Sequence, residues 1–265
     1  MSLTTAVKIA LQRLAPLELA ENWDNVGLLL EPYLAPSISA QSRRKVLLAT
    51  DLTTQVVDSM PEDVGSVVVY HPAIFRGLKS LTQADALQAC ILKCAAKGVS
   101  IYSPHTSLDA AKDGIQDWLA RGLGDGSWQD HSKRPRVWIL AQPAELDHIV
   151  KRVKHHLGMS TYTTGKKHIR SVGLCAGSGA SFLEGSKADL WWTGEMSHHE
   201  VLATVAHGTH VVLCTHTATE RPYLKSYFRA KLEETLNEVR TDENLNDAPY
   251  SVVMSEHEEE VLQFV

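Results

Sequence analysis

The sequence predicts an α/β protein in which layered sheets are flanked by helices. Strand-like runs of β-branched residues alternate with amphipathic helical stretches, the pattern typical of this class. The alternation occurs twice, in two similar lobes at roughly 1–125 and 130–265. Because each lobe is near the small end for a stable core, we expect one domain over residues 1–265.

The sequence of the first lobe predicts, in chain order, a helix, two strands, a helix, a strand and a helix. In order, they are expected within residues 1–17, 45–51, 66–72, 81–98, 99–109 and 114–124. Pro16 ends the first helix, and Pro72 ends the second strand because proline has no N–H for the sheet. In the 81–98 helix, Thr82 begins a capping pattern with Asp85, and Gly98 stands where the helix should end.

The second lobe resumes the alternation after a boundary expected within 124–134. Its strands and helices are predicted at 134–141, 144–158, 170–179, 188–195, 197–207, 210–220 and 221–237. The stretch 160–168 is turn-rich and polar. The Gly-rich AGSG at 176–179 favours a tight turn over a phosphate cradle, since it matches neither complete phosphate-binding motif.

Composition excludes several classes of protein. A net charge of −5 with only short basic stretches argues against a nucleic-acid-binding surface. No apolar run reaches the length of a membrane span. The four cysteines lie in apolar helical or strand-like runs without metal-ligand spacing, so we expect buried, reduced thiols. Reduced thiols favour an intracellular location, the cytoplasm, with a mitochondrial or nuclear pool as the alternative.

Ligand-type side chains follow the ends of the predicted strands. They are Asp51, His71, His105 with Asp109, Glu195, and His216 with Glu220. Ligands of open α/β sheets bind outside the carboxyl ends of the strands, and imidazole with carboxylate suits a divalent transition metal. Structural alternatives remain open: a strand cap at His71, a helix cap at Asp109, and capping boxes at Thr217–Glu220 and Ser197–Glu200.

Six motifs carry a resemblance to a known family. They are ENWDNVGLLLE (21–31), VVVYHPAIFRGLKSLT (67–82), YSPHTSLDAAKDGIQDWLA (102–120), VGLCAGSG (172–179), ADLWWTGEMSHHE (188–200) and THTATERPYL (215–224). In this order they resemble the Nif-three-like proteins, also described as GTP cyclohydrolase-like metal-binding proteins. The length and the Tyr-His-Pro sequence at 70–72 resemble the compact, eukaryotic form.

The resemblance implies a site for one or two divalent ions, of Zn, Fe or Mn, in a ring-shaped hexamer. His71, Asp109 and Glu220 would hold one ion, and Glu220 would bridge to a second ion that His216 also holds. Many bacterial members have histidine where this chain has Tyr70. A neutral phenol is a poor ligand because its pKa is about 10, so we expect the second site to be the weaker one.

Two functions follow from the resemblance. The first is a metal-dependent hydrolase of a small nucleotide-like substrate, in which Glu195 and His198, with His199, would transfer protons. A purely structural role for these histidines, in the first turn of a helix, is the alternative. The second function is a non-enzymatic, metal-stabilised ring that acts as a scaffold or regulatory factor with protein partners. Neither function requires a nucleic-acid or membrane partner.

Overall fold

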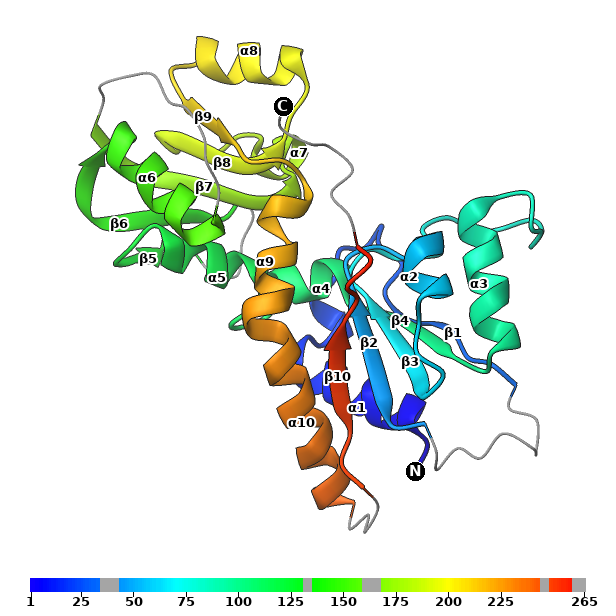
Figure 1. The fold of residues 1–265 in the computed structure, drawn as a ribbon. Coiled ribbons are helices and arrows are strands. Elements are labelled where there is room, and N and C mark those ends of the chain that lie inside the picture. The colour runs from blue at the N-terminus through cyan, green and yellow to red at the C-terminus, as the bar shows by residue number, and fades with distance from the viewer. Residues whose placement is uncertain (34–42, 131–134, 159–167, 244–247, 259–265) are drawn as a thin grey trace. The chain divides into compact units, whose positions relative to one another are not determined.

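The structure is a computed structural model that describes residues 1–33, 43–130, 135–158, 168–243 and 248–258. It confirms the α/β class, with two five-stranded sheets that are each flanked by helices (Figure 1). The chain divides into two compact units, Met1–Lys112 with Leu224–Val265, and Asp113–Tyr223. The chain thus returns to its first unit after residue 223, whereas the predicted lobes placed all residues from 130 to 265 in the second lobe. That the whole chain forms one domain stays a prediction.

The first unit contains a largely parallel sheet. In spatial order its strands are β1 (Gly27–Leu30), β4 (Ser100–Ser103), β3 (Val64–Val69), β2 (Lys45–Ala49) and β10 (Ser251–Met254). Four of them run parallel, and β1 pairs antiparallel with β4. The carboxyl ends of β2, β3 and β4 therefore meet at one edge of the sheet.

Helices cover both faces of this sheet (Figure 1). On one face α1 (Leu3–Leu14) packs against α10 (Arg229–Asp242), and on the other α2 (Thr54–Asp58) packs against α3 (Ala86–Ala96). Successive strand residues are buried on both faces, as the run of valines predicts. The shorter helical turns of the unit are η1 (Leu17–Leu19), α4 (His105–Ala110) and the π-helical η3 (Leu224–Phe228).

The start of α3 was predicted incorrectly. Asp85 is the N-cap residue and accepts a hydrogen bond from the Gln88 amide at 2.8 Å, so the helix begins five residues later than expected. The Thr82 amide instead donates to the Gln88 side chain. Leu87, in the first turn of this helix, is 40% exposed. Gly98 does follow the helix with a positive φ of 68°, as predicted.

The sequence interpretation also missed three short strands. β10 and β1 occupy the two edges of the first sheet and contain four residues each. β5 (Gly126–Trp128) lies within the predicted lobe boundary. Apolar runs this short do not show a period that separates strand from helix, so only the neighbouring strand defines them.

The second unit contains a mixed sheet. In spatial order its strands are β5, β6 (Val137–Glu145), β7 (His168–Ser178), β8 (Leu190–Glu195) and β9 (His210–Leu213). Antiparallel pairs join β5 to β6 and β6 to β7, while β7, β8 and β9 are parallel. The ends of β7, β8 and β9 therefore share one edge, as those of β2, β3 and β4 do in the first unit.

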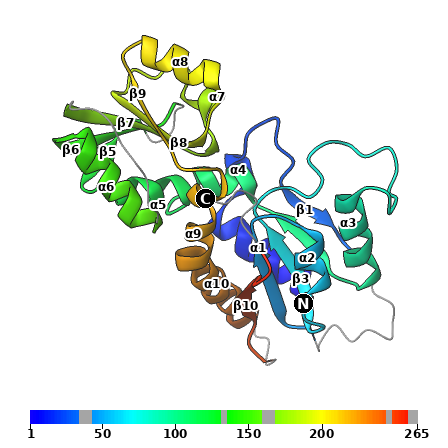
Figure 2. The ribbon, with the colours of Figure 1, turned by 45° about the horizontal axis from the view of Figure 1, so that its top comes forward.

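Helices flank this sheet as well (Figure 2). α5 (Ile115–Gly122) and α6 (Leu146–Leu157) pack on one face, and α7 (Ala180–Leu183) and α8 (His198–Ala206) lie on the other. One apolar face of α5 and one of α6 are buried. Two short turns, η2 (Thr217–Thr219) and α9 (Arg221–Tyr223), complete the unit. The turn-rich segment predicted at 160–168 lies outside the described residues except for its last residue.

Two predictions from composition can be compared with the structure. All four cysteines are free and buried, as expected. Burial raises the pKa of the Cys94 thiol to about 12 and that of the Cys214 thiol to about 11, so both stay protonated at neutral pH. None of the helices in the described ranges is long and apolar enough to cross a membrane.

Candidate metal centre

His71 lies at the tip of β3, where the sequence predicts it. The sheet hydrogen bonds continue beyond the strand, because the Tyr70 amide donates to the Ala49 carbonyl and the His71 amide to the Thr50 carbonyl, each at 3.0 Å. This continuation brings the His71 ring beside Asp51, which follows β2. His71 Nδ1 lies 2.9 Å from Asp51 Oδ1.

A carboxylate on Nδ1 is the arrangement that orients a metal-binding histidine. It favours the tautomer with the proton on Nδ1, so that Nε2 carries the lone pair that binds a metal. Asp51 is itself held from the C-terminal segment, since its amide donates to Glu258 Oε1 at 2.9 Å. Nothing in the local sequence pattern around Glu258 indicates that this residue returns to the end of β2.

Asp109 lies in the last turn of α4 and is 8% exposed. Tyr70, which is 2% exposed, donates its hydroxyl hydrogen to Asp109 Oδ1 at 2.6 Å. The phenol therefore holds a neighbouring carboxylate in place. The helix-capping alternative for Asp109 is wrong, because the N-cap residues of α4 and α5 are Pro104 and Gly114.

His105 and Asp24 form a second imidazole–carboxylate pair beside this tip. His105 Nδ1 lies 2.8 Å from both Asp24 oxygens, and Thr106 also donates to Asp24. Burial alone would raise the pKa of Asp24, but the hydrogen bonds from His105 and Thr106 outweigh it and lower the pKa below its usual value. The His105 ring centre lies 5.6 Å from that of His71 and 5.4 Å from that of Tyr70.

The second unit brings His216, Glu195 and Glu220 together at the ends of β8 and β9. Glu195 accepts from His216 Nδ1, while His216 Nε2 lies 3.1 Å from Glu220 Oε1. The Glu220 side chain is almost completely buried, whereas that of His216 is about one third exposed. The capping box at Thr217–Glu220 does not form, since the N-cap residue of η2 is His216 and makes no side-chain cap.

Gly177 leaves the space that His216 and Glu220 occupy. A Cβ added there would lie 2.7 Å from both Glu220 Oε1 and His216 Nε2, closer than real Cβ contacts. The residue also has a φ of 62°, in the left-handed region that favours glycine. Its amide donates to Thr219 Oγ1 at 2.9 Å, which ties the end of β7 to the turn that carries both ligand-type residues. The predicted tight turn at AGSG is therefore wrong: residues 176–178 are the irregular end of β7, where the register shifts between Cys175 and Ser178, and they make room for two side chains.

These side chains fit a divalent cation. Two ligands of one divalent ion, each about 2.1 Å from it, lie roughly 3.0–3.4 Å apart for angles of 90–110° at the ion, and His216 Nε2 and Glu220 Oε1 are 3.1 Å apart. Both residues offer ligand atoms of the types that Zn, Fe and Mn accept. His216 carries Glu195 on Nδ1 just as His71 carries Asp51, so both histidines show the orienting contact expected of metal ligands.

His198 has different surroundings. With His199 it lies in the exposed first turn of α8, their ring centres 5.7 Å apart. Among the described residues, no hydrogen bond or ion pair connects His198 to Glu195 or His216. Ser197 and Glu200 form the predicted capping box, in which the Glu200 side chain accepts from the Ser197 amide at 2.7 Å. The capping box accounts for this stretch structurally, and proton transfer by His198 stays a prediction.

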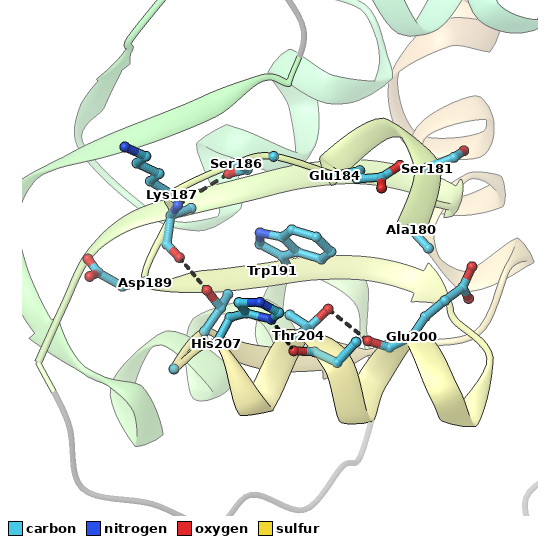
Figure 3. Close-up of a pocket in the computed structure, with 15 residues that line it drawn as sticks. Ala180, Ser181, Glu184, Ser186, Lys187, Asp189, Trp191, Glu200, Thr204 and His207 are labelled. Carbon is cyan, nitrogen blue, oxygen red and sulfur yellow. Dashed lines mark hydrogen bonds between the residues drawn. The ribbon is translucent and has the colours of Figure 1, made fainter.

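A groove of about 790 Å³ lies elsewhere in the second unit, between α7 and α8. Figure 3 shows Trp191 of β8 between Glu184 on one side and Thr204 on the other. Within the part of the unit that the structure describes, the groove is not lined by any of the predicted metal ligands or proton-transfer residues His71, Asp109, Glu195, His198, His216 and Glu220. The metal-ligand chemistry is thus concentrated at the strand tips rather than in the groove.

Comparison with known proteins agrees with the motifs. The family Duf34/NIF3 (NGG1p interacting factor 3) matches residues 1–246. The chain belongs to the Duf34/NIF3 family. A family relative from Schizosaccharomyces pombe, named Protein NIF3 homolog, is 42% identical over 250 residues, which cover 86% of this chain and 88% of the relative. A second relative, NGG1-interacting factor 3 from Saccharomyces cerevisiae, is 33% identical and covers 83% of this chain and 86% of its own.

A solved structure in the Duf34/NIF3 family shows the same fold. The crystal structure of a Bacillus cereus protein related to NIF3 superposes with a TM-score of 0.77 and covers 99% of both chains. Its sequence is only 17% identical, so the likeness concerns the fold alone. The α/β architecture of this chain is therefore that of its family.

Proposed function

We propose that this chain is a divalent-metal-dependent hydrolase of a small, nucleotide-like substrate. His71, Asp109 and Glu220 would hold one ion, and His216 would hold a second ion together with Glu220. The observation that carries the proposal is the His216–Glu220 pair, held 3.1 Å apart under Gly177 with a carboxylate on the far side of the imidazole. The proposal includes either one ion or two, and Glu220 would be the shared ligand if two ions are bound.

The bound metal would polarise the bond under attack and lower the pKa of water to about 7 in favourable cases. The residues around the ligands orient them. Asp51 and Glu195 keep the Nδ1 protons of His71 and His216, and Tyr70 fixes Asp109 by its hydroxyl. Glu195 would also transfer protons, a role supported by its half-exposed side chain and its contact with His216.

Metal content and turnover test this function separately. Glu220→Gln and His216→Ala should lose metal measured by elemental analysis, and Asp109→Ala should lower it. Glu200→Gln is a matched control, because this glutamate caps α8 in the same unit. The wild-type protein should hydrolyse a compound in a nucleotide panel with added Zn²⁺, Mn²⁺ or Fe²⁺. Unchanged metal content in the Glu220 variant would contradict the ligand assignment.

The identity of residue 70 affects how many metal ions we expect the protein to bind tightly. With a phenol in place of a histidine, we propose that the site using His71, Asp109 and Glu220 fills first and that the second site is weaker. Tyr70→His should then add a tight binding step in a metal titration. Two equal binding steps in the wild type, unchanged by the substitution, would contradict unequal sites.

A second candidate is a metal-stabilised ring that binds protein partners without turnover. The printed name of the S. cerevisiae relative, NGG1-interacting factor 3, favours it. Both candidates include a homo-oligomer, and we propose a hexamer built from dimers. Analytical ultracentrifugation at micromolar concentration tests this assembly, and a monomer would contradict it. Metal binding without hydrolysis of any panel compound would favour the scaffold.

A further inference from the structure

Two large aromatic side chains are exposed beside the tip of the first sheet. Trp23 is 52% exposed and Phe75 is 46% exposed. Exposure of this much ring surface is costly, since each Å² of apolar surface left in water forgoes about 25 cal/mol. The two rings contact each other edge to face, with centres 5.9 Å apart. They therefore form a small, continuous aromatic surface, which we call the Trp23–Phe75 platform.

Hydrogen bonds hold the two loops of the platform in place. The Asn25 side chain donates to the Ile74 carbonyl and so connects the loop of Trp23 to that of Phe75. The Glu21 amide donates to Thr106 Oγ1 at 3.0 Å, and the neighbouring Asp24 is buried against His105. A surface fixed in this way binds a flat ligand with less loss of conformational entropy than a mobile loop would.

The platform is continuous with the metal-ligand tip of the same unit. The His105 ring centre lies 6.2 Å from that of Trp23 and 6.5 Å from that of Phe75. On its other side, His105 lies 5.6 Å from the centre of the His71 ring. A ligand that covered Trp23 would be separated from His71 by a single imidazole ring.

We propose that the Trp23–Phe75 platform stacks the planar heteroaromatic ring of the substrate while the polar part of the substrate reaches the His71 tip. The inference rests on the proposed function and adds the residues that recognise the ring. Aromatic faces stack on any nucleobase with little regard to its hydrogen-bonding edge, so the platform provides affinity for a ring rather than selection among bases. Trp23 contributes the larger surface, and Phe75 fixes its orientation.

The loop that carries Phe75 also exposes Leu78 and Leu81, which makes a protein contact the competing explanation. Aliphatic side chains add apolar area but no stacking face. A protein contact would use Leu81 together with Trp23, whereas ring stacking needs Trp23 alone. Leu81→Ala is therefore the matched control for Trp23→Ala.

Two probes with the same phosphate isolate the contribution of the ring. GMP and ribose 5-phosphate both offer a phosphate, and only GMP has a base. Isothermal titration should show that metal-loaded wild-type protein binds GMP about tenfold more tightly than ribose 5-phosphate, the size expected of one stacked base. Trp23→Ala should bring this ratio close to one, Trp23→Phe should restore most of it, and Leu81→Ala should leave it unchanged.

Other outcomes overturn the inference. A wild type with no advantage for GMP, or with no binding of either probe, excludes a stacking platform. An unchanged affinity ratio in Trp23→Ala excludes stacking of the base on Trp23. If Trp23→Ala also forms a smaller oligomer while its affinity ratio is unchanged, Trp23 belongs to a subunit contact instead. If Trp23→Ala does not fold, tryptophan fluorescence tests the same contact. GMP should quench a component of the wild-type fluorescence that is absent from Trp23→Phe. Metal content is measured independently of the two probes. The ratio of GMP affinity to ribose 5-phosphate affinity therefore still tests the platform if the metal-ligand assignment is wrong.

Discussion

The two units position an imidazole and carboxylates at a sheet edge by different means. In the first unit, His71 continues a parallel ladder, and its neighbours Asp51 and Asp109 are each held by hydrogen bonds from other segments. In the second unit, His216 and Glu220 belong to one tight turn that fits only because Gly177 has no side chain. The first arrangement depends on hydrogen bonds between segments, and the second depends on the space left by the missing side chain of Gly177.

This difference teaches which changes each half tolerates. A hydrogen-bonded arrangement weakens in steps, because every bond removed costs about 1 kcal/mol and the rest remain. A steric arrangement fails at once when an added atom occupies the space of a ligand.

Gly177→Ala should have the largest effect, because the new Cβ would overlap His216 and Glu220. Metal affinity should fall about a hundredfold or more, measured by competition with a chelator. Gly185→Ala is the control, since that residue also has a positive φ, of 77°, but nothing lies within 4 Å of its Cβ position. Both variants should lose about 1 kcal/mol of stability from backbone strain, and only Gly177→Ala should lose metal. Equal metal affinity in the two variants would show that space at Gly177 is unimportant.

Asp51→Asn and Glu195→Gln compare the two orienting carboxylates. Each removes the negative partner of a histidine Nδ1–H while keeping the shape of the side chain, so each should weaken metal binding about tenfold to hundredfold. The measurement is a metal titration of both variants beside the wild type. A loss confined to Glu195→Gln would mean that the second unit alone holds the ion, and a loss in neither would remove the orienting role.

Tyr70→Phe tests the hydrogen bond to Asp109. The ring stays, but the buried carboxylate loses a donor, so the free energy of unfolding should fall by about 1–3 kcal/mol. Tyr102→Phe is the comparison, since Tyr102 lies on the neighbouring strand and burial raises its pKa to about 12. A urea titration measures both variants. If Tyr70→Phe is no less stable than Tyr102→Phe, the contact with Asp109 is energetically neutral.

The labelling rates of two buried thiols report how rigid each unit is, and the difference between the units should be the smallest of these effects. Cys94 in the first unit and Cys214 in the second are buried and protonated, so neither should react with a thiol reagent at pH 8 while its unit stays folded. Slow labelling followed by peptide mass spectrometry gives the opening rate around each cysteine. We expect Cys214, next to the edge strand β9, to be labelled first. Faster labelling of Cys94 would reverse the order of local stability.

The sequence alone determined the α/β class, most helix and strand positions and the residue types at the strand tips. It could do so because these features have local causes: valine runs favour strands, helical periodicity buries one face, and Pro72 ends a strand just beyond His71. The six ordered motifs also identified the family, which the comparison confirms.

Only the tertiary structure decided which partners the tip residues have. Nothing local in the sequence connects Tyr70 to Asp109, Asp24 to His105 or Glu258 to the end of β2, because these pairs are separated by 39 to 207 residues. The role of Gly177 could not be predicted either, because the sequence does not show whether a glycine faces water or a glutamate side chain. Short edge strands such as β10 exist only through the strand beside them. Hydrogen bonds and steric fit act between segments that the fold brings together, and for that reason a single sequence does not reveal them.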